Sequence, residues 1–163
     1  ALDLGDGWAL EAWVNPNRIN VGWQAMISKD CNSDESGRAV SLWLEDNRVE
    51  VWYSPERLAL PSNRPLSAGA WVHLAVTFAA NVLTLYIAGA LDRSVSANTP
   101  VTNDYDLTFG QRGQNTNYHY WFQGALDEVR ISRQAWEEDW IRAQVLSMDD
   151  GFITFGGEES TCP

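Results

Sequence analysis

Short apolar runs punctuated by Gly, Pro, Asn and Asp recur along the whole chain. Such runs are typical of the strands of an all-β sandwich. The strands expected from this pattern span residues 10–14, 25–28, 40–45, 48–53, 71–78, 82–88, 106–110 and 125–133, with 152–155 as a candidate edge strand. Residues 134–145 have helical spacing, with Trp136, Trp140 and Ile141 on one side. The pattern therefore predicts an all-β fold with one short helix near the C-terminus.

The strand at 125–133 has an acidic residue on its expected buried side. Val129 and Ile131 share one parity, and Asp127 falls on the same parity. A carboxylate on the buried side of a strand needs either hydrogen-bond donors or a metal ion. Asp127 is therefore a candidate functional residue.

The strands 40–45 and 48–53 are predicted to form a hairpin around the two-residue turn Asp46-Asn47. The expected core-facing pairs are Leu44 with Val49, Leu42 with Val51, and Val40 with Tyr53. The opposite side then carries Trp43 and Trp52 as diagonal neighbours. These two residues form either an aromatic platform on an open sheet face or a patch that another segment covers.

Length and charge narrow the class of protein. The 163 residues fit a single domain, 1–163, which begins in mid-pattern and is expected to be a piece of a longer protein. The net charge of −11 argues against nucleic acid and against an anionic membrane surface as partners. Because no long apolar run is present, membrane insertion is not expected. An acidic surface aids solubility, which is the simpler explanation, and it is also compatible with neutral sugars and with Ca²⁺.

Three segments carry a resemblance to a known family: 8–16, 71–89 and 121–133. In this order they resemble the first long strand, the central hairpin and the last-strand signature of laminin-G-like domains, which belong with the concanavalin A-like lectins, glucanases and pentraxins. The resemblance implies a jelly-roll β-sandwich of two antiparallel sheets. Two departures are Ala88, where the family commonly has Asn before a turn glycine, and Trp136, where a serine-like N-cap is common.

The resemblance also implies calcium, because many laminin-G-like and pentraxin domains carry this ion. The family position that binds it corresponds to Asp127, and the expected co-ligands are Asp3 or Asp6, since the first and last strands of the fold lie together. The alternative is that Asp127 accepts backbone hydrogen bonds and caps a turn. The oxygen-rich stretch 30–37 lacks EF-hand spacing and is better explained as a solvated loop.

Catalysis is not expected. Retaining glucanases of this shape carry the string Glu-x-Asp-x-x-Glu on one strand, and the chain contains no such string. The acidic run at 137–139 lies at the start of the predicted helix, where the helix dipole favours it.

The expected function is a non-catalytic binding module for a glycan or glycoprotein, in an extracellular or cell-surface setting. Trp43 and Trp52 would form the platform. The loop 111–121 would add specificity through Arg112, Asn115, Tyr118, Tyr120 and Trp121. Cys31 and Cys162 form either one disulfide or two separate thiols. The alternative function is a structural or adhesive module that packs against a protein partner or a second copy.

Overall fold

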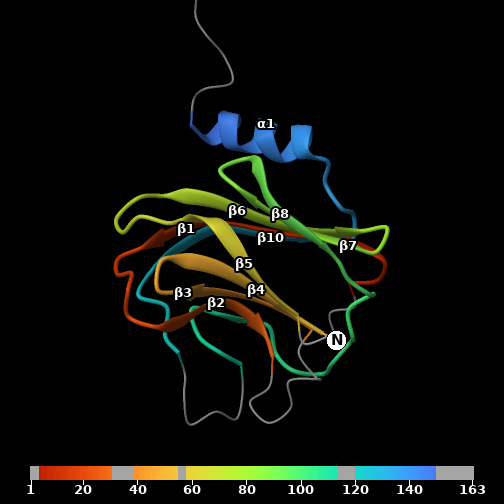
Figure 1. Cartoon of the computed structure of the whole chain (residues 1–163), viewed down its shortest axis with the longest axis horizontal. Coiled ribbons are helices and arrows are strands. Elements are labelled where there is room, and N and C mark those ends of the chain that lie inside the picture. The colour runs from red at the N-terminus through yellow and green to blue at the C-terminus, as the bar shows by residue number, and fades with distance from the viewer. Residues whose placement is uncertain (1–3, 31–38, 55–57, 114–119, 150–163) are drawn as a thin grey trace, which may run out of the picture.

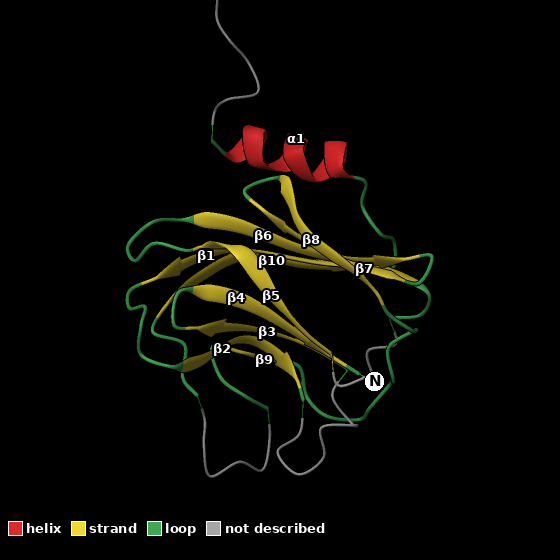
Figure 2. Cartoon of the chain, in the orientation of Figure 1, coloured by secondary structure: helices red, strands yellow, loops and turns green. Residues whose placement is uncertain are grey.

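The computed structural model describes residues 4–30, 39–54, 58–113 and 120–149. These residues form two five-stranded antiparallel sheets, ordered β10-β1-β6-β7-β8 and β5-β4-β3-β2-β9. The sheets pack face to face, and one helix lies across the outer side of the first sheet (Figure 1, Figure 2). The elements are β1 (Gly7–Pro16), β2 (Trp23–Lys29), β3 (Val40–Glu45), β4 (Arg48–Tyr53), β5 (Leu58–Pro65), β6 (Val72–Ala79), β7 (Val82–Ile87), β8 (Ala90–Ser96), β9 (Thr108–Phe109), β10 (Gly124–Ser132) and α1 (Glu138–Met148). The predicted jelly-roll sandwich is confirmed.

The core lies between the two sheets and is centred on stacked aromatic rings. Trp8 of β1 stacks on Phe78 of β6 at 6.1 Å and on Tyr53 of β4, in the opposite sheet, at 6.4 Å. All three side chains are buried. Burying each large apolar side chain contributes about 1.5–3 kcal/mol, so this contact is a main source of attraction between the sheets.

The predicted hairpin of β3 and β4 has the expected register. Val40 pairs with Tyr53, Leu42 with Val51 and Leu44 with Val49, and all six side chains face the core. The residues between them consequently project from the outer side of the sheet. This register places the candidate ligand face described below.

Two strands were not expected from the sequence, and both lie at sheet edges. β5 contains Pro61 and Pro65, which lower its strand propensity but are tolerated at an edge because one side of the strand needs no ladder hydrogen bonds. β8 is largely polar and exposed, so it lacks a buried apolar pattern. The helix begins four residues later than predicted, at Glu138 rather than Gln134. Residues 152–155 lie outside the described part of the chain.

A buried carboxylate joins the two edge strands β5 and β8. Asp92, whose side chain is 1% exposed, accepts hydrogen bonds from the backbone nitrogens of Asn63 (2.6 Å) and Arg64 (3.1 Å) and from the Arg64 Nε (3.0 Å). The same guanidinium donates to the carbonyls of Ile87 (2.7 Å) and Ala90 (2.8 Å). One ion pair therefore holds an edge of one sheet against an edge of the other.

The tight turn between β7 and β8 contains a strained alanine. Ala88 has φ 51° and is followed by Gly89 with φ 75°, the arrangement of a two-residue hairpin turn with both central residues left-handed. An L-residue other than Asn, Asp or Gly adopts this region at a cost of about 1–2 kcal/mol. Ala88, where the family commonly has Asn, therefore occupies a turn position that is unfavourable for alanine.

We expect Ala88→Asn to raise the free energy of unfolding by about 0.5–1 kcal/mol, because asparagine tolerates the left-handed region. Urea denaturation of the variant and the parent measures the difference. Ala90→Asn, two residues later in β8, is the control and should give no gain. Equal stability of Ala88→Asn and the parent would contradict the strain argument.

Candidate ligand-binding face

Three tryptophans gather on the outer side of the β5-β4-β3-β2-β9 sheet. The ring of Trp23 lies 6.0 Å from that of Trp43 and 5.6 Å from that of Trp52, in edge-to-face geometry with both. Trp43 is 4% exposed, whereas Trp23 and Trp52 are half-buried. The predicted pairing of Trp43 and Trp52 on one face is confirmed, with Trp23 in contact with both rings.

Trp23 is a site residue that the sequence analysis missed. β2 begins at Trp23 rather than Ala25, and Trp23 pairs with Glu45 of β3. That pairing places the indole on the same side as Trp43, two residues away along β3. The available signal was the tryptophan immediately before the predicted strand.

The segment after the long loop adds a tyrosine to this group. The ring of Tyr120 lies 5.4 Å from Trp43, and the Tyr120 carbonyl accepts a hydrogen bond from the backbone nitrogen of Ala25 at 2.8 Å. Trp121 forms a parallel bridge with Ala25 and is 58% exposed. The structure thus brings the ring of Tyr120 into contact with the predicted platform and places the backbone of Trp121 beside β2.

Arg112 lies against the rings of this group. Its guanidinium carbon is 5.9 Å from the ring centres of both Trp43 and Tyr120, within cation–π range. Its Nε is 3.5 Å from the carboxylate of Asp30, which is buried. The ion pair positions the cation on the aromatic surface. We call Trp23, Trp43, Trp52, Tyr120 and Arg112 the aromatic cradle.

A carboxyl group with a raised pKa lies beside the aromatic cradle. Glu50 of β4 pairs across the ladder with Trp43 and is 9% exposed. Burial raises the pKa of Glu50 to about 7; a hydrogen bond and the charge of Glu45 act in the same direction, and a hydrogen bond with Trp52 opposes them. The raised pKa of Glu50 favours the protonated carboxyl, which can donate a hydrogen bond as well as accept one.

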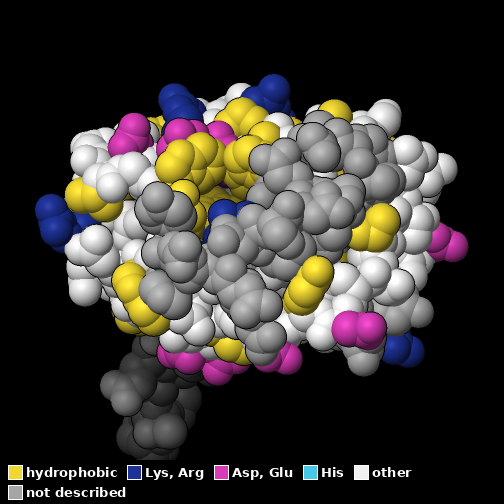
Figure 3. Space-filling view, turned by 90° about the horizontal axis from the view of Figure 1, so that it is seen from below, with side chains coloured by type: hydrophobic (Ala, Val, Ile, Leu, Met, Phe, Trp, Pro, Cys, Tyr) yellow, Lys and Arg dark blue, Asp and Glu magenta, His cyan; other side chains and the backbone are white. Residues whose placement is uncertain are grey.

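Two buried polar atoms on this face lack a hydrogen-bond partner within the described residues: Nε1 of Trp43 and Oε2 of Glu50. Buried polar atoms of this kind are normally satisfied by protein, ordered water or a ligand. In Figure 3, which views the molecule from the side of this sheet, hydrophobic side chains gather beside Asp and Glu side chains, and part of a Lys or Arg side chain is visible next to them. The cradle thus combines flat apolar rings with hydrogen-bonding groups of both kinds.

The prediction that Asp127 lies on the buried side of its strand is wrong. Glu11 pairs with Arg130 and Trp13 with Asp127, so two residues of β10 face one of β1 at a β-bulge. Glu128, in the bulge, has φ 49°. The bulge reverses the parity, so that Val129 faces the core and Asp127 is exposed on the outer side. The Asp127 carboxylate accepts a hydrogen bond from the Glu128 nitrogen at 2.8 Å, which is the turn-capping alternative.

Asp127 and Asp6 do not share a site. Asp127 lies opposite Trp13, whereas Asp6 precedes Gly7 at the other end of β1 and accepts a hydrogen bond from the Thr99 hydroxyl at 2.5 Å. At about 3.3 Å per strand residue, roughly 20 Å separate them. The expected use of both as ligands of one calcium ion is therefore wrong.

Five predicted site residues, of the metal, disulfide and glycan sites, are not part of the described structure. Asp3, Asn115, Tyr118, Cys31 and Cys162 lie outside the described residues. Among the residues that are described, no three His, Cys, Asp or Glu side chains lie together as a metal site would require. Calcium binding by the chain stays a prediction.

The acidic run predicted to be a helix start lies away from the cradle. Glu138 and Asp139 occupy the first turn of α1, on the outer side of the other sheet.

Within the part of the chain that is described, no helix has the length and apolar character needed to cross a membrane.

Comparison with known proteins identifies the family. A family model described as the concanavalin A-like lectin/glucanases superfamily matches residues 1–142. The chain belongs to this superfamily. No curated protein matches the chain in sequence. The superfamily assignment agrees with the observed sandwich and with the resemblance found in three segments of the sequence.

Solved structures with the same fold share little sequence with this member of the superfamily. A candidate carbohydrate-binding protein from Bacteroides ovatus is 15% identical, with a TM-score of 0.70 over 84% of this chain and 40% of its own. The binding domain of paraclostridial mosquitocidal protein 1 is 15% identical, with a TM-score of 0.67 over 90% of this chain and 38% of its own. Trypanosoma rangeli sialidase is 17% identical, with a TM-score of 0.65 over 88% of this chain and 23% of its own. The chain therefore spans 40% or less of each of these proteins, and the likeness shows the fold.

Proposed function

We propose that the chain is a non-catalytic carbohydrate-binding module that takes a glycan on the aromatic cradle. The observation that carries this proposal is the convergence of four aromatic rings on one sheet face around Arg112 and Glu50. Sugar rings have an apolar face that packs on flat aromatic side chains, and hydroxyls that need donors and acceptors. The cradle offers both. We place the module outside the cell, where glycans and glycoproteins are exposed.

The order of burial within the cradle indicates which rings a sugar contacts. Trp52 and Trp23 are half-buried and therefore present indole surface to solvent, whereas Trp43 is covered by Trp23, Tyr120 and Arg112. Trp43 thus supports the other rings, and Trp52 and Trp23 provide the contact surface. Glu50 and Arg112 lie where they can bond to hydroxyl groups at the edge of a stacked ring.

The absence of catalysis is also part of the proposal. Glycoside hydrolysis requires two carboxyl groups about 5–10 Å apart on either side of the scissile bond. The carboxylate of Asp30 is committed to Arg112, and the group nearest Glu50 is Glu45, which shares a hydrogen bond with it. The descriptions of the Bacteroides ovatus protein and of the mosquitocidal binding domain support binding. The sialidase shares the fold over 23% of its length only.

Trp52→Ala is expected to weaken glycan binding by about tenfold or more, because removing a stacking ring costs at least about 1.4 kcal/mol. A glycan array identifies a ligand for the parent protein, and calorimetry then measures the variant, in calcium and in EDTA. Trp52 is preferred to Trp43 because it is only half-buried, so its truncation leaves the core intact.

The matched control is Trp140→Ala, which removes a 49% exposed indole from α1 on the other side of the molecule. It should bind the glycan as the parent does. Unchanged affinity of Trp52→Ala, or lost affinity of Trp140→Ala, would remove the cradle as the glycan site.

A further inference from the structure

A pocket lies on the side of the sandwich opposite the aromatic cradle, where the C-terminal end of α1 meets the outer face of the β10-β1-β6-β7-β8 sheet. It has a volume of about 230 Å³ and is lined by Trp13, Trp71, Asp127, Met148 and Asp149. Trp71 and Met148 are 47% and 49% exposed. The pocket is smaller than the 300–1,000 Å³ usual for drug-sized ligands, so it suits a single side chain better than an oligosaccharide.

The fold assembles this pocket from four elements. Trp13 of β1 lies opposite Asp127 of β10 and opposite His73 of β6. Trp71 precedes His73 by two residues and so projects on the same outer face. The bulge at Glu128 turns Asp127 towards this face, and the end of α1 supplies the remaining wall. The sheet thus provides two indoles and one carboxylate at a single place.

The pocket carries negative charge that the described residues leave uncompensated. Neither Asp127 nor Asp149 has an ion-pair partner within the described part of the chain. Asp149 is the C-cap of α1, whose last turn contains no basic residue. Negative charge at the C-terminal end of a helix is unfavourable, because the macrodipole is negative there, and a cation at this end is favourable.

The charged groups of the sheet next to the pocket are already paired. Arg130 donates to Glu128 at 2.6 Å and to the amide oxygen of Gln144 on α1 at 3.2 Å. Glu11 and His73 are both 2% exposed and form a contact of 3.3 Å beneath the indole of Trp13. Among the residues that line the pocket, the charge that remains for a ligand is that of Asp127 and Asp149.

The chemistry of the lining selects among cations. A calcium ion needs six to eight oxygen ligands, and this pocket offers two carboxylates among mainly apolar walls. An ammonium group is compact and strongly hydrated, so it gains little from indole surfaces. A guanidinium is planar and weakly hydrated, stacks on aromatic rings and pairs with carboxylates through two parallel hydrogen bonds. The lining matches a guanidinium.

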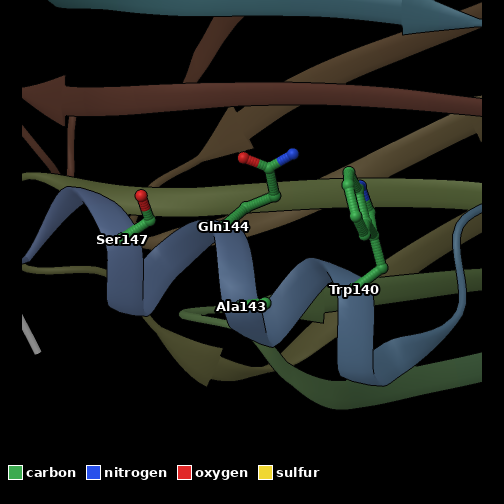
Figure 4. A pocket seen from close by; sticks show the side chains of 4 residues that line it. All are labelled: Trp140, Ala143, Gln144 and Ser147. Atoms are coloured by element: carbon green, nitrogen blue, oxygen red, sulfur yellow. The ribbon is translucent and has the colours of Figure 1, made fainter. Parts of the chain in front are cut away.

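The surface next to the pocket indicates how the guanidinium is presented. A groove of about 220 Å³ continues along the same helix, lined by Trp140, Ala143, Gln144 and Ser147. Figure 4 shows Trp140, Gln144 and Ser147 extending from one side of α1. From Trp140 to Met148 the helix advances about 12 Å, which an extended peptide covers in about four residues.

We propose that this face binds an arginine side chain of a partner polypeptide, with the guanidinium between Trp13, Trp71, Asp127 and Asp149. The partner chain continues along α1 and places an apolar residue against Trp140, about four positions from the arginine. This site does not depend on the proposed glycan site, because the two lie on opposite sheets of the sandwich.

The test is a titration of the whole chain with N-acetyl-arginine amide, followed by NMR of the tryptophan indole N–H signals. We expect the signals of Trp13 and Trp71 to shift. N-acetyl-citrulline amide, which has nearly the same shape without the charge, should bind about tenfold more weakly or worse. Equal binding of the citrulline compound, or no shift with the arginine compound, would overturn the proposal.

Three variants locate the site. Asp127→Asn should weaken binding by about fivefold, the upper range for an exposed ion pair, and Trp71→Ala by about tenfold. Trp52→Ala, on the glycan face, should bind the arginine compound as the parent does. Thermal unfolding of each variant checks that it is folded. Full affinity in Asp127→Asn and Trp71→Ala, or loss in Trp52→Ala, would overturn the assignment.

A peptide with arginine and leucine four positions apart distinguishes a polypeptide partner from free arginine. It should bind about fivefold more tightly than N-acetyl-arginine amide, and Trp140→Ala should remove that gain. Equal affinity of the peptide and the amide would overturn the polypeptide as the source of the guanidinium.

Discussion

Glu50→Gln is expected to make the protein more stable at pH 8 by about 3 kcal/mol while leaving its stability at pH 4.5 nearly unchanged. Burial and Glu45 raise the pKa of Glu50 from 4.5 to about 7 in the folded protein. Between these values the unfolded chain has released the proton and the folded chain still holds it. Rising pH therefore favours unfolding over this interval, and each pKa unit is worth about 1.4 kcal/mol.

The stability that the protonated carboxyl contributes is thus fully present below pH 4.5 and is lost as the pH rises to about 7. Glutamine imitates the protonated carboxyl and does not titrate, so the variant lacks this loss. Urea denaturation at several pH values between 4.5 and 8 gives the two curves. Glu137→Gln, which changes an exposed carboxylate at the start of α1, is the control and should follow the parent. Parallel curves for Glu50→Gln and the parent would show that Glu50 titrates normally.

Asp92→Asn is expected to lower the free energy of unfolding by about 3 kcal/mol. The Asp92 carboxylate is 1% exposed and accepts three hydrogen bonds, from two backbone nitrogens and from Arg64. An amide in its place turns an NH₂ group towards one of these donors and removes the charge that pairs with the guanidinium. Removing one partner of a buried ion pair typically costs 3–5 kcal/mol, and the partial exposure of Arg64 places this case at the lower end.

The chain offers a matched exposed pair as the control. Glu128 and Arg130 are 2.6 Å apart, and both side chains are 41% exposed. Glu128→Gln makes the same chemical change as Asp92→Asn, but solvent screens the pair, so the expected loss is below about 1 kcal/mol. Denaturant unfolding of both variants measures the contrast. If both variants lost the same free energy of unfolding, burial of Asp92 would add nothing to the strength of its ion pair with Arg64.

These two predictions concern different parts of the molecule. Glu50 belongs to the proposed glycan face, where a buried acidic group lowers stability at neutral pH and supplies hydrogen-bonding capacity. Asp92 forms the ion pair that holds the edges of the two sheets together. Residues of a functional site commonly lower the stability of the fold, whereas residues with a purely structural role do not.

The register of the β3–β4 hairpin could be predicted from the sequence alone. The alternation of Leu42 and Leu44 with Trp43, and the two-residue turn, predicted the register and the outward position of the tryptophans. Alternation and turn length are local properties, so no knowledge of the other sheet was needed. The same reasoning missed β5 and β8 because edge strands tolerate proline and polar residues.

The face on which Asp127 lies could not be predicted from alternation along its strand. Leu126 and Val129 both pack against the core, although strict alternation would put them on opposite faces of the strand. These two apolar residues three positions apart are the sign of the bulge in the sequence. Strict alternation does not hold across the bulge, so it predicts the wrong side of the strand for Asp127. Glu128 takes up the extra residue, and its pairing with β1 determines where the bulge falls.

The sequence by itself determined the class of fold, the order of most strands, the family and the aromatic character of one sheet face. These features follow from periodicity, turn residues and composition, which act over a few neighbouring positions. Only the tertiary structure decided that Trp23 contacts Trp43 and Trp52 and that Tyr120 and Arg112 lie against Trp43. It also decided that Asp127 and Asp149 line one pocket with two indoles. Such groupings depend on strand order, on a bulge and on where a helix ends over a sheet. They bring together residues that lie far apart along the chain, and no local pattern specifies those contacts.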